Sequence, residues 1–218
     1  MVPLIVGRSP WTAADAPVGL FSVASCRAGP GGPARTGAFA QQGPGTGHET
    51  VQLIYLVAAG GTIEKVYSEQ TGTVRNADSK IERYFRLLRL PDAEIRTTHV
   101  MNKDSLEMTD ADRQQVLDVI KQLLAERPAP VVITHGTDTM VETGLLLQRE
   151  LQDLRFPIVM TGAMTPLGFE GSDGLQNLTE SLLAVRMLPP GVWLVIHNQV
   201  FPIDRVRKDR EKAQFLPT

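Results

Sequence analysis

The chain has 218 residues, a formal net charge of −2 at pH 7 and one cysteine, Cys26. Because both charge signs are mixed along the sequence, its electrostatics give no reason to expect binding of nucleic acid or of an anionic membrane. No apolar run approaches the roughly twenty residues that span a bilayer, and a single cysteine excludes an intrachain disulfide and a thiolate metal cluster. We expect a cytoplasmic protein that binds a small neutral or zwitterionic molecule.

Residues 1–50 differ in composition from the rest of the chain. They are rich in Gly, Pro and Ala, as in GPGGPARTGAFAQQGPGTG, and show no sustained hydrophobic period. This composition predicts a disordered leader rather than part of a fold. One folded domain is therefore expected over residues 51–218.

From Gln52 onward, strand-like and helix-like segments alternate along the chain. Apolar runs predict strands at residues 53–59, 95–101, 131–134, 156–161 and 192–198, and apolar residues at helical spacing predict helices at residues 81–90, 109–126, 139–152 and 174–187. This alternation predicts a parallel sheet with helices on both faces, joined by short right-handed crossovers.

Three helix starts carry capping signals. Thr109 and Asp112 have the spacing of a capping box. Asp138 and Asp173 come directly before the next two helices and are expected to cap them. Residues 164–174, which lead into Asp173, are expected to form a loop at the mouth of a pocket.

Two of the predicted strands end in a glycine-rich turn that carries a threonine. Residues 60–62 are Gly-Gly-Thr, and residues 135–138 are His-Gly-Thr-Asp. Parallel strands present their carboxyl ends at one edge of the sheet, where open α/β folds bind ligands. We therefore expect the two turns to form one pocket.

No motif indicates a metal or a nucleotide cofactor. His99, His135 and His197 lie in separate segments without the spacing of a zinc site, so structural hydrogen bonding is expected for them. His135 is expected to shape the turn before Thr137. The sequence has neither a G-x-G-x-x-G nor a Walker-type G-x-x-x-x-G-K-[ST] motif, and therefore gives no indication of a nucleotide site.

The two threonine turns resemble those of the bacterial-type L-asparaginase family, TGGTI and HGTDTMEET. Here they read AGGTI at residues 59–63 and HGTDTMVET at residues 135–143. Three further segments match in the family's order: DSLEM (residues 104–108) resembles its substrate-binding DS-x-x-M segment, GAM (residues 162–164) its GAM turn, and VRK (residues 206–208) the segment of its catalytic lysine. The resemblance covers about residues 51–215 and implies a three-layer α/β/α, flavodoxin-like domain.

The resemblance also implies an activity, the hydrolysis of L-asparagine to L-aspartate and ammonia through a threonyl ester, without a cofactor or a metal. It makes Thr62 the nucleophile. It places Thr137, Asp138 and Lys208 in a second catalytic group that moves a proton as the hydroxyl reacts. Tyr67 corresponds to a tyrosine that activates the nucleophile, at a shorter spacing than in the long family members.

Substrate contacts are implied by the same matches. The positions concerned are Gly61, Asp104, Ser105, Gly136 and Ala163. Ser105 is expected to hold the α-carboxylate of the substrate beside backbone N–H groups of the turns. Asp138 is expected to hold its ammonium group.

Two departures from the family pattern leave the choice between asparagine and glutamine open. Ala59 replaces the leading threonine of TGGTI, and Leu106 replaces a polar residue that often follows the serine of the DS segment. Either change alters how the polar ends of the substrate are held, and such pairing decides discrimination.

The chain resembles the short, single-domain family members, which end in a similar VRKxRE stretch. In long members, the carboxyl-terminal domain of a neighbouring subunit supplies an acidic residue to the site. A homodimer or homotetramer is therefore expected to cover the site here. Two other functions stay open: a non-catalytic amino-acid-binding module, and a glutaminase subunit of an amidotransferase.

Overall fold

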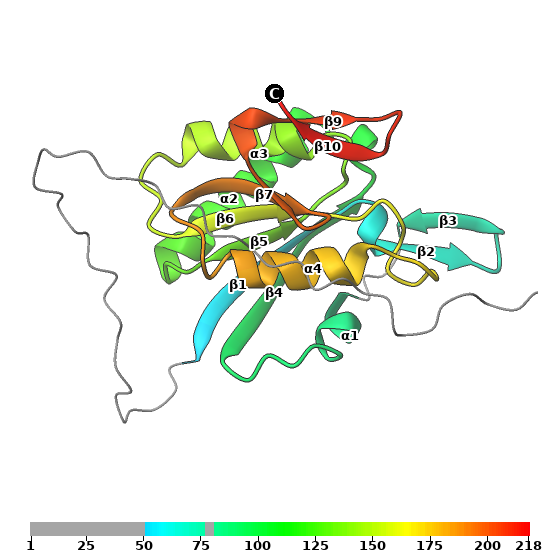
Figure 1. The fold of residues 1–218 in the computed structure, drawn as a ribbon, viewed down its shortest axis with the longest axis horizontal. Helices are drawn as coiled ribbons and strands as arrows, with labels where there is room; N and C mark the ends of the chain where they lie inside the picture. Colours follow the sequence, from blue (N-terminus) through cyan, green and yellow to red (C-terminus); the bar gives the residue numbers. More distant parts are fainter. Residues whose placement is uncertain (1–50, 77–80) are drawn as a thin grey trace, which may run out of the picture. The chain divides into compact units, whose positions relative to one another are not determined.

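A six-stranded sheet forms the centre of the computed structural model, which describes residues 51–76 and 81–218 (Figure 1). Its strands are β1 (Gln52–Gly60), β4 (Ala93–Lys103), β5 (Val131–Thr134), β6 (Pro157–Thr161), β7 (Gly191–Ile196) and β8 (Gln199–Pro202). They lie in the order β4-β1-β5-β6-β7-β8, and every neighbouring pair is parallel except β7 and β8. The leader predicted at residues 1–50 lies outside the described residues.

The parallel strands are continuous apolar runs because both faces of the sheet are covered. β1 is buried from Leu53 to Gly60, and β5 and β6 are buried along their whole length. Numbered along the chain, the parallel strands have the flavodoxin-like order 2-1-3-4-5, with a switch point between β1 and β5. Ligands of such sheets bind beyond the carboxyl ends of the strands at that point.

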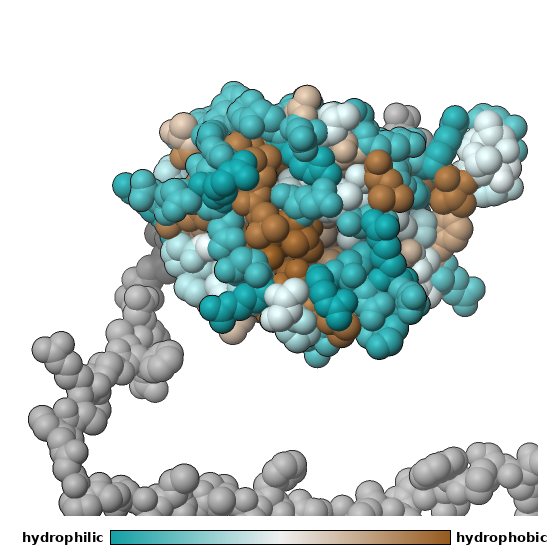
Figure 2. All heavy atoms as spheres, turned by 90° about the horizontal axis from the view of Figure 1, so that it is seen from above, coloured by the Kyte–Doolittle hydropathy of each residue, from teal (hydrophilic) through white to brown (hydrophobic). Residues whose placement is uncertain are grey.

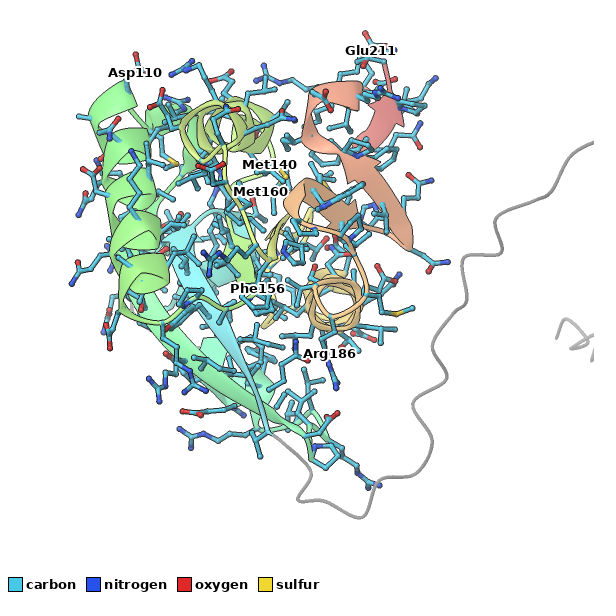
Figure 3. All side chains as sticks on the ribbon, turned by 90° about the vertical axis from the view of Figure 1, so that its left-hand side faces the viewer. Asp110, Met140, Phe156, Met160, Arg186 and Glu211 are labelled. Atoms are coloured by element: carbon cyan, nitrogen blue, oxygen red, sulfur yellow. The ribbon has the colours of Figure 1, made fainter. Side chains whose placement is uncertain are left out.

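Helices on both faces complete three layers. α2 (Asp110–Glu126) and α3 (Met140–Glu150) pack on one face, and α1 (Ile81–Phe85) and α4 (Gly174–Ala184) pack on the other. In the view of Figure 3, Met140 and Met160 lie between α3 and the sheet, within one of two buried apolar clusters. The predicted three-layer α/β/α architecture is confirmed.

The capping box at the start of α2 is confirmed. The Thr109 hydroxyl accepts from the Asp112 backbone N–H, and the Asp112 carboxylate accepts from the Thr109 backbone N–H. Both ends of this reciprocal pair are local, which is why the sequence spacing alone identifies the helix start.

The prediction that Asp138 caps a helix is wrong, and the prediction for Asp173 is correct only in its position. Thr139, not Asp138, is the N-cap residue of α3. Asp173 is at the N-cap of α4, but its carboxylate makes no capping bond. The physical reason is the same at both positions, since each carboxylate is engaged by donors from distant segments, Lys208 at Asp138 and the loop after β6 at Asp173.

The helix predicted at residues 81–90 is shorter than expected. α1 ends at Phe85, and the next residues form tighter turns in which Leu87 N–H donates to Tyr84 O and Leu88 N–H to Phe85 O. Pro91 follows this segment and disfavours helical geometry in the residue before it.

Within the described residues, strand β8, two further hairpins and three short 3₁₀ helices were not predicted from the sequence. The hairpins are β2–β3 (Lys65–Ser68 with Thr73–Asn76) and β9–β10 (Val206–Asp209 with Gln214–Pro217), and the 3₁₀ helices are η1 (Thr62–Glu64), η2 (Ser105–Glu107) and η3 (Ile203–Arg205). Figure 1 shows β2–β3 extending away from the sheet and β9–β10 beside α3. Over residues 51–76 and 81–218, no helix combines the length and the apolar character needed to cross a membrane.

Candidate active site

The two glycine-rich turns touch at the switch point of the sheet. Gly61, after β1, has a φ of 84°, and a Cβ added there would lie 2.3 Å from the backbone N of Gly136, after β5. Both the left-handed backbone and the lack of space therefore require glycine at position 61. The prediction that these turns form one site agrees with this contact.

Ser105 joins the same contact from a third segment. A Cβ added to Gly136 would lie 2.4 Å from both Cβ and Oγ of Ser105, which is buried at the start of η2. The carbonyl oxygen of Ser105 accepts a 2.9 Å hydrogen bond from the Thr139 hydroxyl at the start of α3. Three segments that are distant in sequence thus pack into one small volume.

Lys208, on β9, reaches the second threonine turn. Its Nζ donates to Thr137 Oγ1 at 2.6 Å and to Asp138 Oδ1 at 3.0 Å. Asp138 Oδ1 also lies 3.3 Å from Nε of Arg210. The Lys208 side chain is only 13% exposed, so solvent screens these contacts less than it would at the surface. The structure therefore brings together three of the five predicted catalytic residues.

Thr62 begins η1 and is half-buried, directly after the glycine that contacts the second turn. Tyr67 lies farther along, in the β2–β3 hairpin, and is 57% exposed. Within the described ranges, no hydrogen bond joins Tyr67 to Thr62 or Thr137. The arrangement does not place Tyr67 with the catalytic group, and its activating role stays a prediction.

A buried carboxylate, absent from the sequence prediction, lies beneath both turns. Glu64 is 4% exposed, and its Oε1 accepts from Gly60 N–H at 3.2 Å and from the Thr134 hydroxyl at 3.3 Å. Gly60 ends β1 and Thr134 ends β5, so Glu64 bridges the two strands from which the threonine turns emerge. The sequence around Glu64, Thr-Ile-Glu-Lys, gives no local signal of its burial.

Asp104, predicted to bind substrate, has both carboxylate oxygens engaged within the protein. Oδ2 accepts from Lys65 Nζ at 2.5 Å, and Oδ1 accepts from Leu106 N–H at 3.1 Å. The hydrogen bond from Lys65 is the largest cause that holds the pKa of Asp104 below its usual range. Asp104 is therefore an ionised residue that fixes Ser105 and also orients Lys65.

Gly61 and Ala163 also have limited scope for polar contact with a ligand. The Gly61 N–H donates to Lys103 O at 2.8 Å, and the Gly60 N–H is taken by Glu64. Ala163 is fully buried. If backbone N–H groups hold a developing oxyanion, those of Gly60 and Gly61 are not the donors.

His135 has the structural role predicted for it. It is fully buried, its Nδ1 lies 2.9 Å from the Gly136 carbonyl oxygen and its Nε2 lies 2.9 Å from the Thr143 hydroxyl. Because a carbonyl only accepts, Nδ1 carries the proton and Nε2 accepts from Thr143. Burial lowers the pKa of His135 to about 4, so the ring is neutral at physiological pH.

The other two histidines within the described residues are also paired. His99 Nε2 lies 2.5 Å from a Glu82 oxygen, and His197 Nε2 lies 2.7 Å from Asp173 Oδ2. In the part of the chain that the structure describes, no group of three or more His, Cys, Asp or Glu residues could hold a metal ion.

Comparison with known proteins decides the family. The family model for the N-terminal domain of asparaginase matches residues 53–214. The chain belongs to the asparaginase family. It is 33% identical over 162 residues to L-asparaginase 1 of Escherichia coli (strain K12). The matched region covers 71% of this chain and 47% of that protein. The family resemblance predicted from the motifs is confirmed.

Solved asparaginases have the same fold. The thermostable L-asparaginase of Thermococcus kodakarensis superposes with a TM-score of 0.67 at 26% identity, over 76% of this chain and 51% of that one. L-asparaginase I of Vibrio cholerae gives a TM-score of 0.66 at 29% identity, with the same coverage. The chain thus spans about half the length of the asparaginases that it matches.

Proposed function

We propose that this asparaginase-family chain hydrolyses L-asparagine to L-aspartate and ammonia, with Thr62 as nucleophile. The observation that carries the proposal is the contact of Lys208 Nζ with Thr137 Oγ1 and Asp138 Oδ1, next to the turn that bears Thr62. A hydroxyl is a weak nucleophile unless nearby groups move its proton, and a lysine–carboxylate pair beside a second hydroxyl provides such a path.

The reaction proceeds in two steps. In the first, Thr62 Oγ1 attacks the side-chain amide carbon, the C–N bond breaks, and the hydroxyl proton leaves with the nitrogen as ammonia. In the second, water attacks the threonyl ester, the Thr62 hydroxyl re-forms, and L-aspartate leaves. The Thr137–Asp138–Lys208 group relays the proton in each step and offsets negative charge that develops nearby.

Recognition of the substrate requires opposite charges at its two ends. Ser105 is proposed to hold the α-carboxylate, since it is buried against Gly136 between the two turns. Asp138 is proposed to hold the ammonium group, because its side chain remains 28% exposed although it also pairs with Lys208 and Arg210. Lys65, paired with Asp104 next to Ser105, adds positive charge on the carboxylate side.

Assembly and location form part of the same proposal. Figure 2 views the face that carries α3 and shows an apolar area bordered by hydrophilic residues. Leu145 of α3 is 42% exposed. Such a surface favours the proposed homodimer or homotetramer. A cytoplasmic location is proposed in line with one structural relative, named a probable cytoplasmic L-asparaginase from Campylobacter jejuni.

The proposal is tested by ammonia release from L-asparagine and from L-glutamine. The purified full chain is compared with Thr62→Ala and with Thr73→Ala, a matched loss of a threonine on the exposed β3 strand. Release by the wild type and by Thr73→Ala, but not by Thr62→Ala, is expected. The ratio of the two substrates then decides between asparaginase and glutaminase activity.

Two other outcomes would replace the proposal. No release, together with a raised Tm in the presence of L-aspartate or L-asparagine, would identify a binding module. Release from glutamine only when a partner protein is added would identify an amidotransferase subunit.

A further inference from the structure

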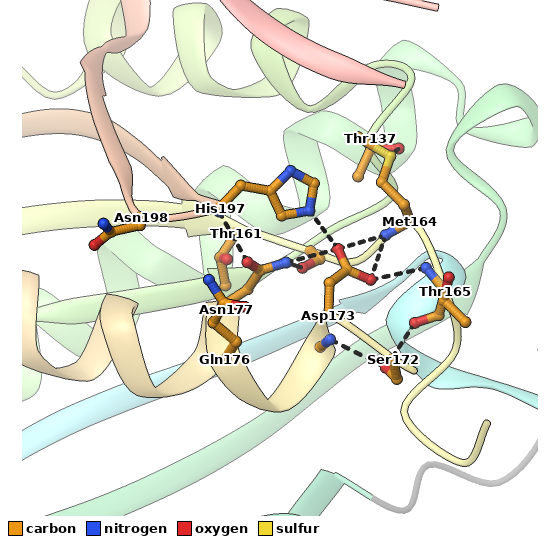
Figure 4. Close-up of polar contacts among 12 residues, drawn as sticks. Thr137, Thr161, Met164, Thr165, Ser172, Asp173, Gln176, Asn177, His197 and Asn198 are labelled. Atoms are coloured by element: carbon orange, nitrogen blue, oxygen red, sulfur yellow. Dashed lines mark hydrogen bonds and ion pairs between the residues drawn. The ribbon is translucent and has the colours of Figure 1, made fainter. Parts of the chain in front are cut away.

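Asp173 is the centre of a hydrogen-bond network that the reaction scheme above does not use (Figure 4). Its carboxylate accepts from the backbone N–H groups of Met164, at 2.9 Å and 3.1 Å to the two oxygens, and of Thr165, at 2.9 Å. It also accepts from Asn177 Nδ2 at 2.9 Å and from His197 Nε2 at 2.7 Å. The side chain is only 16% exposed, so these donors replace the water that would otherwise solvate it.

Asn177 extends this network to the turn before Met164. It is fully buried, and its Nδ2 also donates to the Gly162 carbonyl oxygen at 2.9 Å. Its Oδ1 accepts from the His197 backbone N–H at 2.9 Å. Asp173 and Asn177 together therefore hold the backbone on both sides of Ala163.

His197 is held in an uncommon backbone conformation by the same contacts. His197 and Asn198 form the two-residue turn between β7 and β8, with φ values of 51° and 59°. Two positive φ values match the tight turn that joins twisted antiparallel strands. The turn directs the imidazole to Asp173, as Figure 4 shows.

The backbone held by Asp173 lies directly against the second threonine turn. A Cβ added to Gly162 would lie 2.4 Å from the His135 carbonyl oxygen and 3.3 Å from Thr137 Cγ2. The Thr137 hydroxyl lies 3.7 Å from Met164 Sδ, in the geometry of a weak hydrogen bond to sulfur. Any displacement of residues 162–165 would therefore reach the hydroxyl that Lys208 contacts.

We propose that Asp173 is a positioning residue for the active site, which holds residues 162–165 against Thr137 and is itself clamped by His197. The effect on catalysis that this inference predicts rests on the proposed function. The structural part of the inference, that Asp173 fixes the position of Thr137, does not depend on that function.

The carboxylate is suited to this role because it stays ionised. Burial raises the pKa of Asp173, but the N–H donors of Met164 and Thr165 and the His197 side chain together bring it below the usual value. A neutral alanine would leave those buried donors without an acceptor. Asparagine would keep a carbonyl oxygen for Met164 and Thr165, but would place its amide nitrogen against Asn177 Nδ2 and His197 Nε2.

The test compares Asp173→Ala, Asp173→Asn and Asp92→Ala in the full chain, well below each Tm. Asp92 is the matched control, since it also accepts from several donors, in its case those of Arg186, at the opposite end of the sheet. The first readout is kcat and KM of ammonia release. The second is the NMR shift of the Thr137 and Met164 methyl groups, which needs no activity.

We expect Asp173→Ala to move both methyl resonances and to lower kcat roughly tenfold or more with a smaller change in KM, because misplaced catalytic groups cost rate. Asp173→Asn should recover a large part of both effects, and Asp92→Ala should show neither. Unchanged Thr137 and Met164 resonances in a folded Asp173→Ala would overturn the inference. If the wild type releases no ammonia, the proposed function fails, and the methyl resonances still decide the role of Asp173.

Discussion

Lys208 Nζ lies 2.6 Å from Thr137 Oγ1, although the two residues are 71 positions apart in the chain. The contact exists because β9 crosses beside the start of α3, where Asp138 provides the opposite charge. Lys208 belongs to a charged stretch, DRVRKDREK, but its side chain is largely buried and faces a hydroxyl.

Replacement of Lys208 by methionine should lower kcat for ammonia release by roughly a hundredfold or more, the usual contribution of proton transfer by a positioned side chain. The change removes the donor to Thr137, while Asp138 keeps its contact with Arg210. Steady-state kinetics on L-asparagine measure the effect. Lys212→Met is the control in the same hairpin, since Lys212 is 66% exposed and should be nearly neutral. Equal activity of the two variants would exclude Lys208 from catalysis.

Replacement of Glu64 by alanine should destabilise the fold by about 1–3 kcal/mol, because the Gly60 N–H and the Thr134 hydroxyl would lose a buried acceptor. Glu64→Gln keeps an oxygen at that place and should be milder. Urea unfolding gives the free energies. Glu107→Ala, at an exposed carboxylate in η2, should change stability by no more than about 0.5 kcal/mol. A similar value for Glu64→Ala would contradict the bridging role.

The stability of the fold should fall between pH 6.5 and pH 4 because of His135. Burial lowers the pKa of His135 to about 4 from 6.5, so in this interval the unfolded chain binds a proton that the folded chain does not. At about 1.4 kcal/mol for each pKa unit, the loss on going from pH 6.5 to pH 4 is on the order of 3 kcal/mol. Urea unfolding across the interval measures it. NMR titration of the His135 ring near pH 6.5 would show the prediction to be wrong.

Replacement of Gly136 by alanine should raise KM for L-asparagine by roughly tenfold or more, since a loss of about 1.4 kcal/mol in binding is tenfold. The new Cβ would lie 2.4 Å from Ser105 Cβ and Oγ, so Ser105 has to move away from the turn. The control is Gly72→Asn in the β2–β3 turn, where a Cβ meets nothing within 4 Å and asparagine tolerates the left-handed backbone, with a φ of 64°. An unchanged KM in a folded Gly136→Ala would remove Ser105 from substrate binding.

Much of the fold follows from local patterns in the sequence. Continuous apolar runs identify buried parallel strands such as β1, and the Thr109–Asp112 pair identifies the start of α2, because each signal lies within a few residues. The glycine turns were predictable for the same reason. The ends of helices were harder to predict, since α1 ends at Phe85, where the chain turns toward Pro91.

The rest of the site depends on contacts between distant residues. Neither Asp138 nor Asp173 caps a helix with its side chain, because a carboxylate before a helix has the same local signature whether it caps the helix or binds Lys208 or His197. Glu64 was missed because its partners, Gly60 and Thr134, belong to two strands that meet only in the sheet. Spacing in one sequence carries no information on such pairings.

Detection of the threonyl ester tests the central claim most directly. The full chain is mixed with L-asparagine and quenched in acid within the first turnover, and its peptides are examined by mass spectrometry. The account predicts an aspartyl adduct on the peptide that contains Thr62, with none in Thr62→Ala. Ammonia release by a chain in which the adduct lies on Thr137, or in which Thr62→Ala retains full activity, would contradict it.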